Sequence, residues 1–309
     1  MDSVKVFAPA TVANVACGFD ILGFALDRPG DTVRARLSSE PGVTIEKITS
    51  QFGDLPFDPA KNTASVAAAA FLERYKPGLG LVLEIEKQMP IGSGLGSSAA
   101  SAAAAVFAAH QLAGEPCSKA DLVEFAMLGE AVACGSAHAD NVAPSIIGGF
   151  TLIRSYDPLH VLSIPYPNHL RTAVVHPEIE IRTEDARKVL KRNVPLHQAI
   201  AQFGNIAGLV LGLCTSDSSV IATSLDDVII EPERSVLIPG FMKAKVAAIE
   251  AGALGCSLSG SGPSIFALCE SEEIAIAAGK QIAAVFQEQG IASTTYISGI
   301  NNQGAKVLD

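Results

Sequence analysis

Apolar and polar residues alternate along three stretches in the first part of the chain, and each stretch is predicted to be a strand. Residues 4–7 and 33–37 alternate near the amino terminus. Residues 81–87 place two leucines and an isoleucine on one side and a valine and two glutamates on the other, which is the period of a half-buried strand. Further apolar runs predict strands at 149–153, 172–175, 255–259, 265–269 and 292–297.

Capping signals and helical periodicity predict helices between these strands. Residues 62–75 begin at an asparagine that can cap a helix, and residues 97–112 are rich in alanine without proline. A third helix is predicted over 118–134, with a capping box at its start and an apolar stripe of Leu122, Phe125, Ala126 and Gly129. Three more helices are predicted to begin at Thr183, His197 and Phe241, and a last helix is predicted over 272–289.

Strands and helices mixed in this order predict an α+β protein in two lobes, with a boundary in the proline-rich stretch 156–167. The 309 residues, of which 49% are hydrophobic and 17% charged, supply enough material for a substantial core. The formal charge of −10 comes without a block of basic residues, which makes nucleic acid a poor partner.

Several features predict a cytoplasmic protein. The amino terminus lacks the basic region and apolar run of a secretory signal. The apolar runs 99–109 and 206–214 are shorter than the ~20 residues that cross a bilayer. The six cysteines form no C-x-x-C pair. We therefore expect reduced cysteines and no membrane span.

A glycine- and serine-rich bend lies between the predicted strand 81–87 and the predicted helix 97–112. Glycines at alternate positions let the backbone approach an anion, and the helix that follows offers unpaired N–H groups. The bend is not a Walker A motif, because no lysine follows its last glycine. A flexible turn that permits close helix packing is the alternative. Three hydroxyl donors accompany the glycines, and one of them could hold a metal: Ser93, Ser97 and Ser98.

Glu130 shares the helix face that should be buried, because it follows Ala126 by four residues and Leu122 by eight. A buried carboxylate needs a cation or strong hydrogen bonds. Magnesium bound to ATP would satisfy it, since Mg²⁺ takes few protein carboxylates and completes its shell with phosphate oxygens and water. The alternative, a stripe edge that reaches solvent, has equal weight at this point.

The segment 135–144 is predicted to be a loop in which His138, Asp140 and Asn141 stand among small residues. Small neighbours indicate close approach by a ligand, although a lone histidine is more often structural and Asp or Asn often caps a turn. A second glycine-rich turn joins the predicted strands 255–259 and 265–269, where a plain hairpin is the simpler interpretation.

Two arginines are candidates for anion binding. Arg187 and Arg234 each lie close to acidic residues in the sequence. Arginines in such positions usually form surface ion pairs that contribute little. Their functional interpretation is a fork for a carboxylate or phosphate.

Three separated segments resemble homoserine kinases, which share a superfamily with galactokinase, mevalonate kinase and phosphomevalonate kinase. They are PATVANVACGFDILGFAL at 9–26, the bend at 90–101 and the second glycine turn at 255–267. The first is the most specific to homoserine kinases, and the correspondence spans nearly the whole chain. Cys17 is a departure, because many members have proline or another small residue there.

The resemblance implies a fold and a reaction. The implied fold has an amino-terminal ribosomal-protein-S5-domain-2-like lobe with a left-handed β-α-β crossover, over residues 1–160, and a ferredoxin-like carboxy-terminal lobe, over 161–309. The active site is implied between the lobes, and family habit implies a homodimer. The implied reaction converts ATP and L-homoserine to ADP and O-phospho-L-homoserine, a step toward threonine.

The resemblance also implies the nucleotide site. Ser98 and Glu130 are implied beside magnesium, and Gly260 and Ser261 are implied to close the site from the other lobe. The implied phosphate loop consists of Pro90, Ile91, Gly92, Ser93, Gly94, Leu95, Gly96, Ser97, Ser98, Ala99, Ala100 and Ser101.

On the substrate side, the charges of homoserine imply their partners. Asp20 is implied to meet the ammonium group, and Arg187 and Arg234 the carboxylate. Phosphoryl transfer passes through a loose transition state, so a strong base is not obligatory. Asn141 is expected to orient the hydroxyl, and Asp140 is either a base or a structural turn residue. The implied pocket is completed by Asn14, His138 and Thr183.

Overall fold

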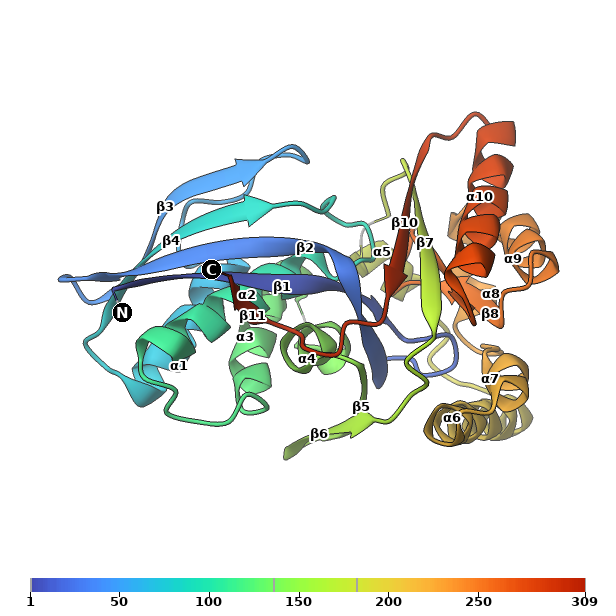
Figure 1. The fold of residues 1–309 in the computed structure, drawn as a ribbon, viewed down its shortest axis with the longest axis horizontal. Helices are drawn as coiled ribbons and strands as arrows, with labels where there is room; N and C mark the ends of the chain where they lie inside the picture. Colours follow the sequence, from blue (N-terminus) through green and yellow to red (C-terminus); the bar gives the residue numbers. More distant parts are fainter. Residues whose placement is uncertain (1, 136, 182, 309) are drawn as a thin grey trace.

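A computed structural model of the chain describes residues 2–135, 137–181 and 183–308, without the side chains of residues 133, 134, 183 and 184. Figure 1 shows two lobes, each built on its own sheet, with the larger sheet on the left. The predicted α+β class and two-lobe organisation are confirmed.

The amino-terminal lobe is built on a seven-stranded sheet. Its main path runs β11-β1-β2-β4-β3, and the β5–β6 hairpin joins it at β2. Only β3 and β4 pair in parallel among the described strands, and the helix between them provides the crossover that parallel strands require. The strands are β1 (Ser3–Ala13), β2 (Leu22–Ser38), β3 (Gly42–Ser50), β4 (Gly80–Lys87), β5 (Phe150–Tyr156), β6 (Leu159–Ile164) and β11 (Lys306–Leu308).

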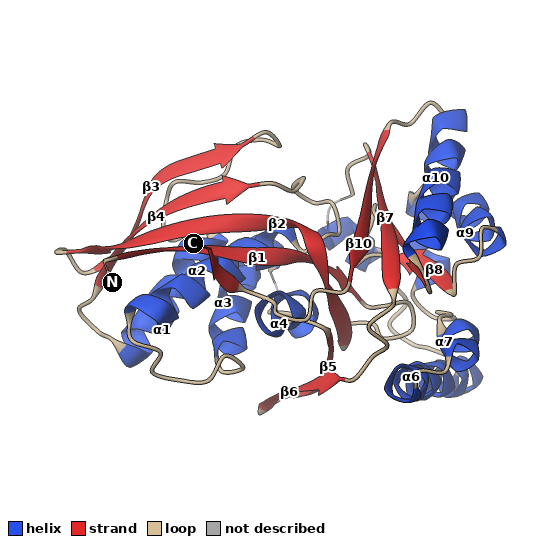
Figure 2. Cartoon of the chain, viewed as in Figure 1, coloured by secondary structure: helices blue, strands red, loops and turns tan. Residues whose placement is uncertain are grey.

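Four helices cover one face of this sheet (Figure 2). They are α1 (Thr63–Tyr75), α2 (Ser97–Leu112), α3 (Leu122–Cys134) and α4 (Ala139–Ile147). Almost all of α2 is buried, because its alanines let the sheet and the other helices approach closely. The packing is tight enough that a Cβ on Gly129 would lie 2.5 Å from the Thr63 carbonyl oxygen.

The carboxy-terminal lobe has a four-stranded antiparallel sheet in the order β10-β7-β9-β8. Numbered within the lobe, this order is 4-1-3-2, and helices fill the two long connections, which is the ferredoxin-like arrangement that was predicted. The elements are β7 (Arg171–Pro177), α9 (Phe241–Glu250), β8 (Gly255–Leu258), β9 (Ile265–Cys269), α10 (Glu272–Glu288) and β10 (Ser293–Gly299).

The connection from β7 to α9 carries additional helices, among them the longest in the lobe. That helix, α6 (Leu196–Thr215), lies at the outside of the molecule (Figure 1). In the described part of the chain it alone is long and apolar enough to cross a membrane, and 22% of its most apolar 18-residue stretch is buried. The others are α5 (Thr183–Lys188), α7 (Ser218–Ser224), α8 (Glu231–Arg234) and the 3-10 turn Ser235–Leu237.

The boundary between the lobes lies later than 160/161, because that position falls inside β6. This strand pairs with β5 in the amino-terminal sheet, so the second lobe begins at β7. The chain also returns at its end: β11 pairs with β1, and Ile300 bridges Leu26. The last residues therefore belong to the first lobe, which local composition could not indicate.

The predicted loop over 135–144 is wrong from Ala139 onward, because residues 139–147 form α4 with Pro144 inside the helix. Proline leaves the carbonyl four residues earlier, that of Asp140, without its helical partner. That carbonyl faces β2, where a Cβ on Gly23 would lie 1.9 Å from its oxygen. A glycine on the neighbouring strand thus makes room for the helix.

Candidate functional site

The bend between β4 and α2 has the backbone of an anion site. Gly92, Gly94 and Gly96 have φ values of 67°, 78° and 65°, in the region that favours glycine. A Cβ on Gly94 would lie 2.4 Å from the Ser259 carbonyl oxygen, and one on Gly96 would lie 2.1 Å from the Thr11 hydroxyl. The N-cap residue Gly96 has no side chain that could bond the first N–H groups of α2, which are therefore open to an anion.

This bend faces a cavity of about 920 Å³ between the two lobes. The volume is typical of a cofactor or metabolite site. Four members of the predicted loop do not line the cavity: Pro90, and the buried residues Leu95, Ala99 and Ala100, which pack below it. The side chain of Thr183 lies outside the described residues. The other predicted residues converge on this cavity: Asn14, Asp20, Ile91, Gly92, Ser93, Gly94, Gly96, Ser97, Ser98, Ser101, Glu130, His138, Asp140, Asn141, Arg187, Arg234, Gly260 and Ser261.

The second glycine turn is a hairpin, and it also docks onto the glycine bend between β4 and α2. The Ser259 hydroxyl donates to the Gly94 carbonyl at 2.6 Å, and the Ser264 N–H donates to the Ser93 carbonyl at 3.2 Å. The Asn14 amide donates to the Gly260 carbonyl at 2.9 Å. Both lobes therefore meet at the glycine bend.

A buried ion pair below the bend was missed by sequence reasoning. Lys87 pairs with Asp31 and donates to the Ser97 carbonyl at 2.5 Å, while Ser101 donates to Asp31 at 2.7 Å. The Asp31 carboxylate also accepts from the Gln88 N–H at 3.0 Å. One signal was available: Lys87 continues the apolar side of the alternating strand, where a cation needs a buried partner.

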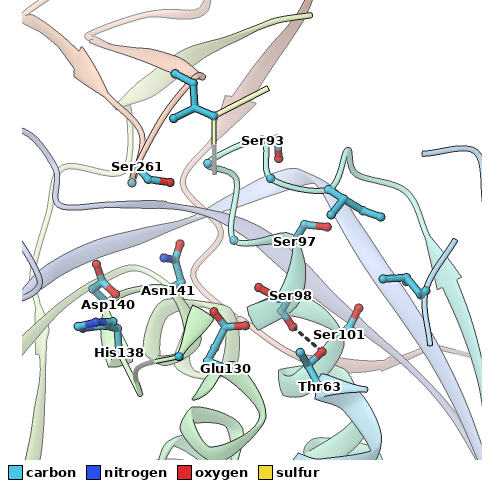
Figure 3. Close-up of a pocket in the computed structure, with 18 of the residues that line it drawn as sticks. Thr63, Ser93, Ser97, Ser98, Ser101, Glu130, His138, Asp140, Asn141 and Ser261 are labelled. Atoms are coloured by element: carbon cyan, nitrogen blue, oxygen red, sulfur yellow. Dashed lines mark hydrogen bonds between the residues drawn. The ribbon is translucent and has the colours of Figure 1, made fainter. Parts of the chain in front are cut away.

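Glu130 is 7% exposed, which supports the buried-face interpretation over a solvent edge. In Figure 3 its carboxylate and the Ser98 side chain face the same part of the cavity. Hard oxygen donors of this kind suit Mg²⁺. Within the described residues no group of three or more His, Cys, Asp and Glu side chains could hold a metal, so phosphates and water would complete the shell.

The charged groups at the other end of the cavity form one cluster. Arg187 donates to Asp20 at 3.0 and 3.4 Å and lies 2.8 Å from Nε2 of His138. Arg187 and Arg234 both lie over the Phe19 ring, at 5.6 and 5.0 Å from its centroid. The alternative prediction, that these arginines form surface ion pairs with acidic residues close in the sequence, does not describe this arrangement.

Arg234 is held in place by main-chain carbonyls. It is 3% exposed and donates to the carbonyls of Ala186 and Gly260 at 3.0 and 3.1 Å. Burial lowers the pKa of Arg234 to about 10, which still leaves it cationic at neutral pH. Burial also lowers the pKa of His138, which favours a neutral imidazole. The cluster thus presents a fixed cation next to the Asp20–Arg187 pair.

Asn141 and Asp140 lie in the first turn of α4, on the cavity wall (Figure 3). The Thr11 hydroxyl donates to Oδ1 of Asn141 at 2.7 Å, which directs the amide nitrogen to the cavity. Asp140 is 4% exposed, and its Oδ1 has no hydrogen-bond partner among the described residues. Burial first, and then the charges of Asp20 and Glu130, raise the pKa of Asp140 to about 7.

The loop that carries Asp20 has an unusual backbone. Asn14, Val15 and Ala16 have φ values of 69°, 45° and 59°, and that of Asp20 is 60°. Non-glycine residues with such values are costly and concentrate at functional sites. Oδ1 of Asn14 accepts from the Asp20 N–H at 3.0 Å, so this side chain holds the loop as well as lining the cavity.

Two further residues, one on β5 and one within the loop, bear on the structure of this loop. The Tyr156 hydroxyl, which sequence reasoning missed, donates to the Asp20 carbonyl at 2.7 Å. Cys17 is buried, and burial raises the pKa of its thiol to about 12, which makes it an unreactive core group.

Comparison with known proteins identifies the family. Residues 62–149 match the GHMP kinases N terminal domain, and residues 214–288 match the GHMP kinases C terminal domain. A homoserine kinase of Chlorobium phaeobacteroides (strain DSM 266) is 50% identical over 320 residues, covering 100% of both chains. One from Xylella fastidiosa (strain M12) is 40% identical over 98% of this chain and 94% of its own. This chain belongs to the homoserine kinase family.

Solved structures agree with this membership. Homoserine kinase from Cytophaga hutchinsonii superposes with a TM-score of 0.96 at 55% identity, covering 100% of this chain and 98% of that one. L. major mevalonate kinase, at 18% identity and a TM-score of 0.68 over 96% of both chains, shares the fold. The family therefore accounts for the whole chain, and kinases of this superfamily use ATP.

Proposed function

We propose that this protein transfers the γ-phosphoryl group of ATP to the side-chain hydroxyl of L-homoserine, giving O-phospho-L-homoserine for threonine synthesis. One observation carries the proposal: a glycine bend with open helix N–H groups shares its cavity with a carboxylate and two arginines. The bend suits a triphosphate, and the opposed charges suit the ammonium and carboxylate of an amino acid.

Homoserine would replace part of the Asp20–Arg187 contact. Its ammonium group would take Asp20, and its carboxylate would take Arg187 and Arg234. An alcohol without these charges would leave the buried Arg234 without an anion, which is a strong source of discrimination. Neutral His138, next to Arg187, fits a pocket-lining role.

Asn141 would orient the attacking hydroxyl through its amide nitrogen, since Thr11 occupies its oxygen. We propose that Asp140 accepts the hydroxyl proton. Its partnerless Oδ1 and a pKa near neutrality support this role over a purely structural one. Ser98 and Glu130 would hold Mg²⁺, which when bound neutralises charge on the phosphate oxygens.

We place the protein in the cytoplasm, without a nucleic-acid partner. A charge of −10 without a basic stripe does not suit a phosphate backbone. The described cysteines Cys17, Cys117, Cys214, Cys256 and Cys269 are free thiols, as in a reducing compartment. The α6 helix contains no lysine or arginine, so it lacks the basic residues of a helix that binds a membrane surface.

We also propose a homodimer in which α6 packs against α6 of a second copy. Leu196, Ile200, Phe203 and Leu211 are 73%, 60%, 64% and 57% exposed along this helix. An apolar groove of about 710 Å³ lies beside Phe203 and Leu211. Monomers rarely expose so continuous an apolar face. A second copy fits because α6 carries no charged side chain, so two α6 faces meet without like-charge repulsion between them.

Light scattering coupled to gel filtration tests the dimer. Phe203→Asp should convert a species of twice 31.9 kDa into a monomer, and Met242→Asp, at an exposed methionine on α9, should not. A monomeric wild type at tens of micromolar, or binding of wild type to anionic vesicles, would overturn this part of the proposal.

A coupled assay of ADP release tests the reaction itself. L-Homoserine should stimulate ADP release, whereas homoserine analogues that lack the amino or the carboxylate group should not. Release driven equally by mevalonate or a sugar alcohol would contradict the proposal. Analogues that retain both charges but lack the side-chain hydroxyl should compete with L-homoserine.

A further inference from the structure

A buried glutamine on α6 connects two parts of the substrate end that are far apart in the sequence. Gln202 is 5% exposed, and its amide nitrogen donates to the Cys17 carbonyl at 2.8 Å and to Oδ1 of Asp227 at 2.9 Å. Its amide oxygen accepts from the Val228 N–H at 3.0 Å. Both donors and the acceptor are therefore used, and a flipped amide would place oxygen against oxygen.

The first connected part is the strained loop that ends at Asp20. Cys17 follows the three residues with positive φ and precedes Phe19, the ring under both arginines. Gln202 donates to the Cys17 carbonyl at the middle of this loop. A shift of that carbonyl would therefore move both Phe19 and Asp20.

The second connected part is the turn that leads into α8, which carries Arg234. Oδ1 of Asp227 accepts from the Ile229 and Ile230 N–H groups at 3.0 and 2.9 Å. Its Oδ2 accepts from the Glu231 N–H at 2.9 Å. Asp227 thus fixes the start of α8, and Gln202 fixes Asp227.

The turn is also anchored from below. Glu231 accepts from Lys245 on α9 and from Ser257 on β8, each at 2.5 Å, and is buried. These contacts tie α8 to its own lobe. Among the side chains that the structure describes in this region, Gln202 is the one that bonds both the Asp20 loop and the α8 turn.

We propose that Gln202 is a positioning residue that sets the distance between the ammonium-binding and carboxylate-binding groups of the substrate site. The inference rests on the proposed function, because it assumes that Asp20 and Arg234 bind opposite ends of one amino acid. Gln202 does not line the cavity between the lobes. It acts through the Cys17 carbonyl and the Asp227 carboxylate.

Two substitutions of similar size test this role. Gln202→Met removes all three hydrogen bonds, and Gln202→Glu places a carboxylate opposite the Cys17 carbonyl and Asp227. Each should raise KM for L-homoserine by about tenfold or more, while kcat stays within about threefold and nucleotide affinity within about twofold. A merely structural glutamine would lower the melting temperature and the active fraction without separating the two substrates.

Asn205 supplies the matched control on the same helix. Its amide donates to the Asp226 carbonyl at 2.8 Å, so it tethers the same turn but bonds no residue of the Asp20 loop. Asn205→Ala should leave KM for L-homoserine unchanged. Equal increases in KM for Asn205→Ala and Gln202→Met would overturn the proposal, as would equal changes for ATP and homoserine.

Hydrogen exchange on the wild-type protein gives an independent readout. It tests the proposal even if the Gln202 variants fail to fold. With a non-hydrolysable ATP analogue present, L-homoserine should slow exchange of amides in 14–22 and in 228–231 together. Protection confined to 14–22 would overturn the coupling. If the wild type shows no homoserine-dependent ADP release, the proposed function fails. If the wild type releases ADP in response to homoserine and the Gln202 variants keep the wild-type KM, only the proposed role of Gln202 fails.

Discussion

The two ends of the cavity are formed by different chemical groups. At the proposed nucleotide end the main chain forms the site: Gly92, Gly94 and Gly96 have positive φ values, and α2 begins without a side-chain cap at Gly96. At the proposed amino-acid end the groups are charged side chains, each held by further contacts: the Asp20 carboxylate by Arg187, and Arg234 by two main-chain carbonyls. The first end depends on small residues and the second on particular side chains.

This difference predicts how each end responds to substitution. A changed side chain at the amino-acid end should cost activity directly. At the proposed nucleotide end a substitution should have a large effect only where its Cβ meets another atom or where a metal ligand is lost.

Asp140 is expected to give the largest effect. Asp140→Asn should lower kcat by about 10² to 10⁴, because a general base contributes on that scale. In wild type, kcat/KM should fall as pH drops below the Asp140 pKa of about 7, since the carboxyl of the free enzyme becomes protonated. Adding Asn141→Asp to this variant should not restore kcat. A loss of less than about tenfold would assign Asp140 a structural role.

The same group makes a prediction about stability. The folded-state pKa of about 7 lies above the ordinary value of 3.8, so the wild type loses stability as pH rises from about 4 through 7. Asp140→Asn should therefore raise the free energy of unfolding at pH 8 by about 1–3 kcal/mol and leave it nearly unchanged at pH 4. Urea unfolding at the two pH values measures this. Equal effects at both would contradict the buried-carboxyl account.

Glu130→Gln and Ser98→Ala are expected to lower kcat by about 10² and leave KM for L-homoserine within about threefold, because both act on the phosphates. Steady-state kinetics over a magnesium titration measures this, and a higher magnesium requirement should accompany the loss. Glu124→Gln is the control, since Glu124 lies on the same helix in an exposed pair with Arg74.

Arg234→Leu should show the opposite pattern. KM for L-homoserine should rise by about 10², because a buried charge-assisted contact is lost, while nucleotide affinity changes little. Calorimetry with ADP and initial-rate kinetics separate the two effects. Arg154→Leu, at an exposed position on β5, is the control. An exchange of patterns between Arg234 and Glu130 would refute the division of the cavity.

The glycine bend should show the smallest and most selective effects. A Cβ on Gly94 would meet the Ser259 carbonyl, whereas one on Gly92 meets nothing within 4 Å, although both have positive φ. Gly94→Ala should raise KM for ATP about tenfold, and Gly92→Ala about two- to threefold, reflecting backbone strain alone. Similar losses for both would show that strain, and not the closeness of the second lobe, governs the bend.

Local patterns were enough to predict much of the fold. The alternation at 81–87, the Asn62 cap and the position of Glu130 on its helix all depend on neighbours within a turn or a strand, and the structure contains each of them. The left-handed glycines of the bend were visible for the same reason.

What was missed depends on contacts between distant residues. Lys87 pairs with Asp31 across 56 positions, and Gln202 meets the Cys17 carbonyl across 185. Pro144 is tolerated in α4 where the structure has Gly23 facing the Asp140 carbonyl. β11 joins β1 from the other end of the chain. None of these partners is marked by local periodicity.

A crystal structure with a non-hydrolysable ATP analogue, magnesium and L-homoserine would locate both ligands in the cavity between the lobes. We expect the triphosphate on the N–H groups of 92–98, with the homoserine ammonium at Asp20 and its carboxylate at Arg234. A triphosphate bound elsewhere, or an amino acid bound outside the Asp20–Arg234 cluster, would contradict it.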